Sequence, residues 1–191
     1  MSLESTSIIS VSRCKYDRQS RVGCHFHSFY HIMYLIGGSS SLQINDMHCK
    51  SIEHAVCIFK PGICHEWTSD SKDPMWSIEV KFVTYDSCLT SKLDLLPLQF
   101  KNRNIKVRML FENIVKEAMY KRPLYKEIIK ANVYELVFQM VRGQSMENME
   151  CVQKNEAEED YKMDDTGNAD ELNNKIMQYI NNNYYKKISL G

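Results

Sequence analysis

The sequence predicts an α+β protein in which an antiparallel β-sandwich or barrel precedes a helical region. Two observations lead to this prediction. Short β-rich segments separated by turn-forming clusters recur up to about Tyr85. After Leu96-Pro97-Leu98 the apolar residues recur at helical spacing instead. A chain of 191 residues is long enough for one domain with attachments, or for one domain and part of another.

The predicted strands are short and regularly spaced. They read SIISVS, HIMYLI, SLQIN, HAVCIF and MWSIEVKFVTY, and the clusters GGSSS, IND, KPG and SDSKDP separate them. Such a series of strands and turns is typical of an antiparallel sandwich or barrel. We expect the barrel to span residues 21–98 and an N-terminal arm to span residues 1–20.

Two helices are predicted in residues 99–143. The apolar positions of the first are Ile105, Leu110, Phe111, Ile114, Val115 and Ala118. The second follows Pro123, which a first helical turn tolerates, and is expected to end before Gly143. Its apolar face is wide enough to serve both the core and a homodimer interface. The residues expected at that interface are Ile128, Ile129, Leu136, Val137 and Met140.

An acidic stretch follows the second helix. Residues 147–171 hold ten acids and two lysines, a charge of −8, in a chain whose formal net charge is zero. Acidic segments poor in aromatic residues bury too little apolar area to order themselves. We therefore expect residues 144–170 to be a linker. Residues 171–191, ELNNKIMQYINNNYYKKISLG, then begin a third amphipathic helix.

Several classes of protein are excluded by composition. No apolar run approaches the roughly 18 residues that cross a bilayer, and the first residues do not form a signal peptide. A cytoplasmic protein without a membrane partner is therefore expected. The cysteines form no CxxC pair and are odd in number, which argues against a disulfide framework and favours reduced thiols. They are Cys14, Cys24, Cys49, Cys57, Cys64, Cys88 and Cys151.

Three histidines lie at odd positions in the stretch CHFHSFYHIMYLIGGS, which begins at Cys24. Side chains alternate between the two faces of a strand. If this stretch is extended without a bulge, His25, His27 and His31 all point the same way. The pattern is compatible with a metal site, a ligand pocket or a histidine-rich part of the core.

The histidine spacing resembles the motifs of the cupins. His25-x-His27-x3-His31-x6-Gly38 is similar to the first cupin motif, H-x-H-x3,4-E-x6-G, with histidine in place of the glutamate. The later stretch KPGICHEW, which contains His65, is similar to the second motif. The resemblance implies a small jelly-roll barrel, with the motif residues on strands that face its interior.

The remainder of the chain resembles bacterial transcription regulators of the AraC type. QYINNNYYKKISL is similar to the first helix of their DNA-binding domain, and WSIEVKF to the strand that ends their sensory barrel. The resemblance implies a sensor and dimerisation domain that binds a small-molecule effector and is not an enzyme. DNA would be contacted only through helix-turn-helix units, which should begin where this sequence stops at Gly191.

A ligand pocket inside the barrel is expected to use the histidines together with apolar side chains. The candidate ligand-binding residues are His25, His27, His31, Met33, His65, Trp67 and Glu79. Glu79, a lone acid within a strand, is expected either to face solvent or to contact the ligand. Tryptophans in small barrels are commonly core filling, but Trp67 shares the face of His65.

The alternative is a metal centre. His25, His27, His31 and His65 offer four imidazole ligands for a divalent metal, as in a metal-dependent cupin dioxygenase or isomerase. Metal-bound histidines need acceptors for their second ring nitrogen. The sequence offers only Glu53 and Glu66 as nearby carboxylates. We therefore favour an effector pocket and expect no cofactor.

Overall fold

The computed structural model describes residues 3–160, and the side chains of residues 4–144. The chain divides into two compact units, residues 1–147 and residues 148–191. The first unit contains the described strands and the candidate site, and the account below concerns that unit. Among the described residues, no helix combines the length and the apolar character needed to span a membrane.

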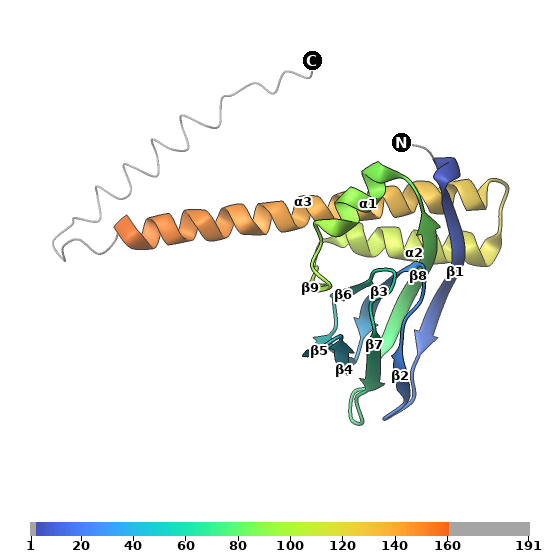
Figure 1. The fold of residues 1–191 in the computed structure, drawn as a ribbon, viewed down its shortest axis with the longest axis horizontal. Coiled ribbons are helices and arrows are strands. Elements are labelled where there is room, and N and C mark those ends of the chain that lie inside the picture. The colour runs from blue at the N-terminus through green and yellow to red at the C-terminus, as the bar shows by residue number, and fades with distance from the viewer. Residues whose placement is uncertain (1–2, 161–191) are drawn as a thin grey trace, which may run out of the picture. The chain divides into compact units, whose positions relative to one another are not determined.

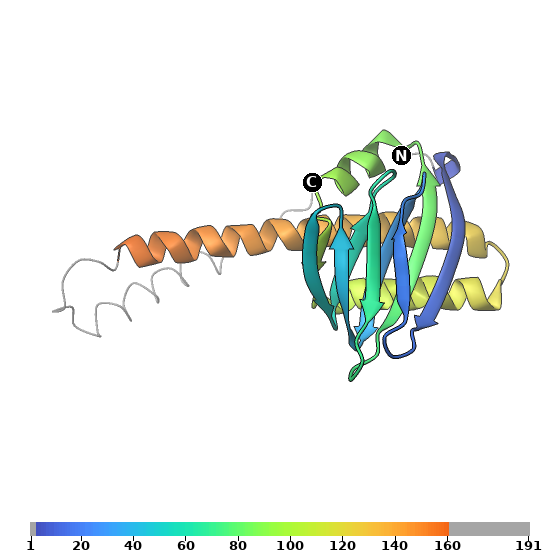
Figure 2. The same cartoon turned by 60° about the horizontal axis from the view of Figure 1, so that its bottom comes forward.

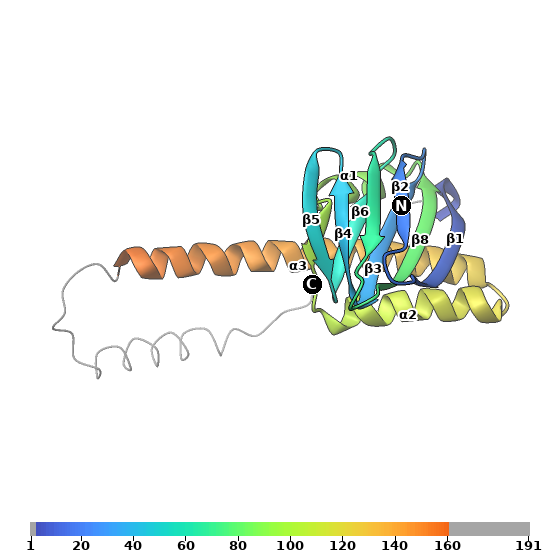
Figure 3. The same cartoon turned by 90° about the horizontal axis from the view of Figure 1, so that it is seen from below.

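The described strands form two antiparallel sheets (Figure 1). One sheet has the order β1-β8-β3-β6-β9 and the other the order β2-β7-β4-β5. The strands of the two sheets face each other as the layers of a barrel (Figure 3). Their bounds are β1 Thr6–Lys15, β2 Arg21–His25, β3 Tyr30–Gly37, β4 Ser39–Ile44, β5 Met47–Ile52, β6 Ala55–Phe59, β7 His65–Ser69, β8 Trp76–Thr84 and β9 Gln99–Lys101.

The central strands of the five-stranded sheet, β3, β6 and β8, are buried on both faces. In β3, Met33 and Leu35 belong to a cluster inside the barrel, whereas Ile32 and Tyr34 belong to a second cluster outside it. This alternation follows from the two-residue period of a strand. Because β3 has an apolar layer on each side, its sequence HIMYLI is almost continuously apolar rather than alternating.

Three helices follow the barrel strands: α1 Ser87–Asp94, α2 Ile105–Tyr120 and α3 Tyr125–Asp160. α2 and the first part of α3 lie along the outer face of the five-stranded sheet (Figure 2). There the ring of Phe111 stacks on that of Tyr34 with centroids 4.9 Å apart. Asn104 caps the start of α2 by accepting a hydrogen bond from the backbone N–H of Lys106. The helices therefore complete the core that the sheet alone leaves open.

The predicted fold class is confirmed, but two boundaries are wrong. Half of the segment predicted as an N-terminal arm is β1, an edge strand paired with β8. α3 does not end before Gly143 but continues to Asp160, through much of the predicted linker. The residues after Gly143 are rich in glutamate and also contain glutamine and methionine, which favour helix even where they cannot form a core. The predicted helix in residues 171–191 lies outside the described residues.

Most of the residues expected at the dimer interface are buried within the chain itself. Ile129, Leu136, Val137 and Met140 are at most 3% exposed and belong to the core between α3 and the sheet. Of the five residues, only Ile128 is substantially exposed. The width of the apolar face of α3 is thus accounted for by intramolecular packing.

The expectation of reduced thiols is wrong for one pair of cysteines. Cys24 and Cys64 form a disulfide between β2 and the segment before β7. The free cysteines among the described residues are Cys14, Cys49, Cys57 and Cys88. Sequence spacing could not reveal the pair, because the two residues lie 40 positions apart and become neighbours only when the strands pair.

Candidate metal and ligand site

The three histidines of the first motif do not lie on one continuous strand. His25 ends β2, His27 lies in the connection that follows, and His31 is the second residue of β3. The expectation that strand alternation would align them is therefore wrong, because the chain leaves one sheet and enters the other between His25 and His31.

The imidazoles of His25 and His27 nevertheless come together with that of His65. The ring centroids of His25 and His65 are 4.3 Å apart, and those of His27 and His65 are 4.9 Å apart. His25 and His65 are also opposite each other in the pairing of β2 with β7. The ring of Phe59 stacks on His65 at 3.9 Å and fixes its plane. The barrel thus gathers residues from both sequence motifs around one point.

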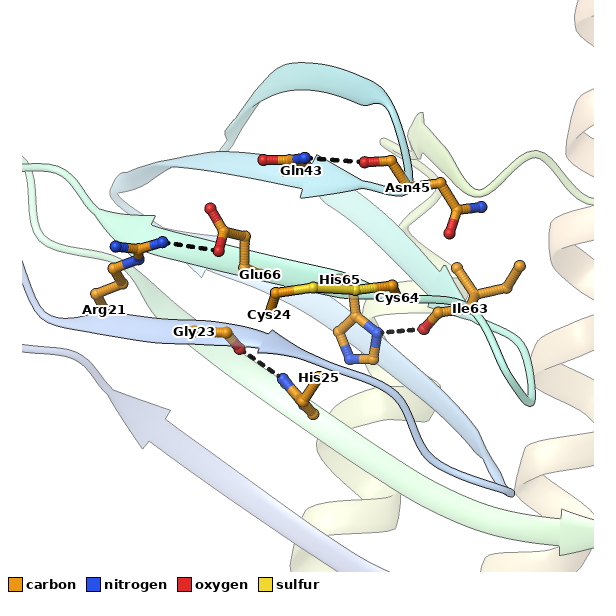
Figure 4. The surroundings of a disulfide bond; sticks show 10 residues. All are labelled: Arg21, Gly23, Cys24, His25, Gln43, Asn45, Ile63, Cys64, His65 and Glu66. Atoms are coloured by element: carbon orange, nitrogen blue, oxygen red, sulfur yellow. Dashed lines mark hydrogen bonds and ion pairs between the residues drawn. A yellow bond between two sulfur atoms is a disulfide. The ribbon is translucent and has the colours of Figure 1, made fainter.

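Backbone carbonyls determine which nitrogen each histidine presents. The Nδ1 atoms of His25, His27 and His65 lie 2.9, 2.7 and 2.8 Å from carbonyl oxygens. The acceptors are the carbonyls of Gly23, Phe29 and Ile63, the first and last of which are drawn in Figure 4. A carbonyl only accepts hydrogen bonds, so in each neutral ring Nδ1 carries the hydrogen. Each Nε2 therefore presents a lone pair.

This arrangement meets the main requirement of a metal centre. Each of the three residues offers a ligand nitrogen, and these nitrogens lie within 4.8 Å of one another. Their second nitrogens are already held by acceptors, which fixes the ring orientation. The expected lack of acceptors is therefore wrong, because backbone carbonyls rather than carboxylates supply all three.

His31 differs from the other three histidines. Its Nε2 lies 3.2 Å from Oε2 of Glu79, a carboxylate on the neighbouring strand β8. The ligand nitrogens that lie close together thus belong to three histidines, His25, His27 and His65. The predicted set of four histidines is not brought together. The ring of His31 borders the cluster, with its centroid 5.8 Å from that of His27. Burial lowers the pKa of His31, and the carboxylate of Glu79 opposes that shift.

Glu79 is a buried carboxylate at the centre of a small hydrogen-bond network. It is 3% exposed, so it does not face solvent. The hydroxyl of Tyr16 donates to it at 2.6 Å and that of Ser77 at 2.9 Å. Burial alone would raise the pKa of Glu79, but contacts with His31, Tyr16 and Ser77 lower it to about 2. The carboxylate is therefore ionised at neutral pH. Tyr16 and Ser77 were not singled out from the sequence.

Burial keeps His27 and His65 uncharged at neutral pH. It lowers the pKa of His65 to about 4, and it also lowers the pKa of His27. At neutral pH both rings therefore carry a free lone pair rather than a second proton. This is the protonation state that metal binding requires.

Several buried polar atoms at the site have no hydrogen-bond partner. They include Nε2 of His27, Nε2 of His65 and Nε1 of Trp67. Met33 and Trp67 are buried in the inner apolar cluster. Buried polar groups without partners are uncommon and costly, so these atoms mark the place where a ligand would be bound.

A cavity lies away from the histidines. Its volume is about 650 Å³, and it is formed outside the barrel by β1, the end of α2 and the start of α3. Lys121, Lys126 and Lys130 contribute to its lining. This cavity contains none of the residues with unpaired buried atoms, and we therefore regard the histidine cluster as the candidate site.

Comparison with known proteins agrees with this fold. The family described as "AraC-like ligand binding domain" matches residues 10–137. None of the curated proteins compared matches the chain significantly. Because the family match covers more than half of the sequence, the chain belongs to the family of AraC-like ligand-binding domains.

Solved structures with detectable similarity are distant. A predicted oxalate decarboxylase from Thermotoga maritima is 20% identical with a TM-score of 0.36, and the match covers 40% of this chain and 67% of that one. An oxalate decarboxylase from Bacillus subtilis is 16% identical with a TM-score of 0.35, and the match covers 39% of this chain and 20% of that one. KdgF from Halomonas sp. is 13% identical with a TM-score of 0.36, and the match covers 44% of this chain and 81% of that one.

Proposed function

We propose that this chain is the effector-sensing module of an AraC-type transcription regulator and that it binds its effector at His25, His27 and His65. The observation that carries the proposal is the convergence of three imidazoles whose Nδ1 atoms are all engaged by carbonyls. Two of the remaining Nε2 atoms are buried without a partner. A ligand that engages these atoms removes the cost of leaving them unpaired.

The chemistry of the three nitrogens selects the kind of ligand. Three converging lone pairs attract a cation or a hydrogen-bond donor and repel an anion. Imidazole ligands suit first-row metals such as zinc, iron, nickel and copper. Bound there, such an ion would act as a Lewis acid that anchors an oxygen or nitrogen atom of a further ligand. Metal–nitrogen distances of about 2.1 Å in a tetrahedral site place the nitrogens about 3.4 Å apart, so the rings would have to move inward.

The same geometry favours a second candidate function, a metal-dependent cupin enzyme such as a dioxygenase or isomerase. An open coordination position beside three histidines is what a catalytic metal needs. The two functions differ in a measurable way, because a sensor returns its ligand unchanged. Membership of the AraC-like ligand-binding family supports the sensor.

A regulator of this type also needs a dimer and a DNA-binding domain. We propose that the homodimer uses the exposed side of α2 rather than the buried face of α3. The supporting residues are Ile105, Met109, Met119 and Tyr120, which are 57–69% exposed. Ligand binding would shift the balance between arrangements of paired helix-turn-helix domains attached beyond Gly191. The proposed location is the cytoplasm, where such a regulator reaches DNA.

The test is elemental analysis of protein purified without a nickel column, followed by thermal-shift measurements with divalent metals and organic amines. We expect one equivalent of metal, or a rise in melting temperature, in the wild type and in His48→Ala, which alters an exposed histidine of β5. The effect should be lost in His27→Ala and in His65→Phe. A ligand response that survives both variants would refute the site. Turnover of a bound substrate would favour the enzyme.

A further inference from the structure

We propose that Cys24 and Cys64 form a reversible redox pair that holds His25 in the three-histidine site and so sets the ligand affinity of that site. This inference rests on the proposed function, because it concerns the regulation of the same histidines. Each cysteine directly precedes one of the histidines, in the pairs Cys24-His25 and Cys64-His65. The disulfide therefore joins the two strands at the point where they supply their ligands (Figure 4).

β2 is the less securely held of the two strands. It is the edge strand of its sheet and pairs only with β7, whereas β7 lies between β2 and β4. The pairing of β2 is irregular between Val22 and His25, so the ladder is interrupted next to the histidine. The disulfide at Cys24 spans this interruption.

The other link across the outer face is weak. Arg21 forms an ion pair with Glu66 at 2.9 Å, but the Arg21 side chain is 63% exposed. Exposed ion pairs of this kind contribute little to stability. Once the disulfide is reduced, β2 is held against β7 by its ladder hydrogen bonds, by the backbone N–H of Ser69 donating to the carbonyl of Ser20, and by the ring contact of His25 with His65.

The two other ligands do not depend on the disulfide in this way. The backbone N–H of Gly62 donates to the carbonyl of His27 at 2.9 Å and holds that residue in place. His65 lies on the interior strand β7 and is stacked on Phe59. Reduction should therefore release His25 selectively and leave a site with two histidines in place of three.

A small disulfide can serve as the oxidant that forms the Cys24–Cys64 bond. The thiolate of one cysteine attacks a low-molecular-weight disulfide and releases one small thiol, and the second cysteine then displaces the other. The protein loses two protons and two electrons and gains the Cys24–Cys64 bond, while the small disulfide becomes two thiols. The reagent can reach the pair, because Cys24 is exposed and Cys64 is partly exposed. Disulfides in reducing compartments commonly have such a sensing role.

The experiment compares reduced and oxidised protein in two independent measurements. The first is hydrogen exchange of the β2 amides, which we expect to be faster in the reduced form and in the Cys24→Ser/Cys64→Ser variant. The second is Zn²⁺ affinity by competition with a chelator, which we expect to be about tenfold weaker in those forms. Cys88→Ser, which removes a free cysteine of α1, is the matched control and should respond to redox state as the wild type does.

A third variant tests the role of His25 itself. His25→Ala should bind Zn²⁺ weakly in both redox states, because the ligand controlled by the disulfide is already absent. Equal exchange in β2, or equal Zn²⁺ affinity, in reduced and oxidised wild type would overturn the redox inference and leave the proposed function intact. Absence of Zn²⁺ binding in both forms would instead count against the metal site, and β2 exchange would then decide whether the disulfide holds the strand.

Discussion

Nε2 of His31 and Oε2 of Glu79 lie 3.2 Å apart, and both side chains are nearly inaccessible to solvent. The histidine that occupies the glutamate position of the first cupin motif is thus directed to a carboxylate from another strand. Glu79 in turn accepts hydrogen bonds from Tyr16 and Ser77. The pair borders the histidine cluster through the ring of His31, whose centroid lies 5.8 Å from that of His27.

The first prediction concerns Glu79. Glu79→Gln keeps the shape of the side chain but removes its charge, so Tyr16, Ser77 and His31 lose a strong acceptor. Hydrogen bonds to a charged group typically contribute about 1.5–3 kcal/mol, and we expect the free energy of unfolding in urea to fall by an amount of that order. Glu66→Gln, which breaks the exposed pair with Arg21, should cost less than about 1 kcal/mol. Similar losses in the two variants would contradict the central role of Glu79.

The second prediction concerns pH. The pKa of His65 is about 4 in the folded protein and 6.5 in the reference state. Between these values the unfolded chain binds more protons, so stability rises with pH there and is lost as pH falls from 6.5 to 4. The shift corresponds to a loss of about 3 kcal/mol. Urea unfolding followed across this range measures it. His65→Phe retains stacking on Phe59 and should show a flatter profile, and an unchanged slope would count against the assignment.

The third prediction concerns the glycine of the first motif. Gly38 has φ of +72°, and a Cβ added there would lie 2.0 Å from the carbonyl oxygen of Pro74. Gly38→Ala should therefore be severely destabilising, by at least about 3 kcal/mol, since it combines backbone strain with a backbone clash. At Gly37 an added Cβ meets nothing within 4 Å. Thermal unfolding should show Gly37→Ala close to wild type, and equal effects would be inconsistent with this turn.

The fourth prediction concerns assembly. Leu136 is fully buried within the chain, whereas Met109 is 57% exposed on α2. Leu136→Lys should unfold the protein, because it places a charge in the core. Met109→Lys should preserve the circular dichroism spectrum but shift the dimer towards monomer in light scattering. Ser91→Lys, at an exposed position of α1, is the control and should remain dimeric. A wild type that is monomeric at high micromolar concentration would disprove the dimer.

The strands that the sequence predicted are those with continuous or alternating apolar residues, such as β3, β6 and β8. β2, β5 and β7 were not identified, because their sequences RVGCH, MHCKSI and HEWTS are largely polar. α1 was also missed, since only Leu89 and Leu93 of its eight residues are buried. In these segments tertiary pairing, rather than local propensity, determines the structure.

The candidate site, too, could be predicted from the sequence only in part. Motif spacing identified His25, His27 and His65, whose nitrogens converge. It could not identify the partner of His31, because Glu79 is brought beside it only by the pairing of β3 with β8. The carbonyl acceptors could not be predicted from the sequence either, because every residue has a carbonyl. Only the folded backbone shows which carbonyls point at an imidazole.

β3 lies between the barrel interior on one face and the helices on the other. His31 and Met33 border the histidine site, and the alternate residues Ile32 and Tyr34 are embedded among the helices. Packed interiors have low compressibility, so a displacement of this strand by an occupant on one side must be taken up by α2 and α3 on the other. The strand therefore acts as a stiff mechanical link between the barrel interior and the helices.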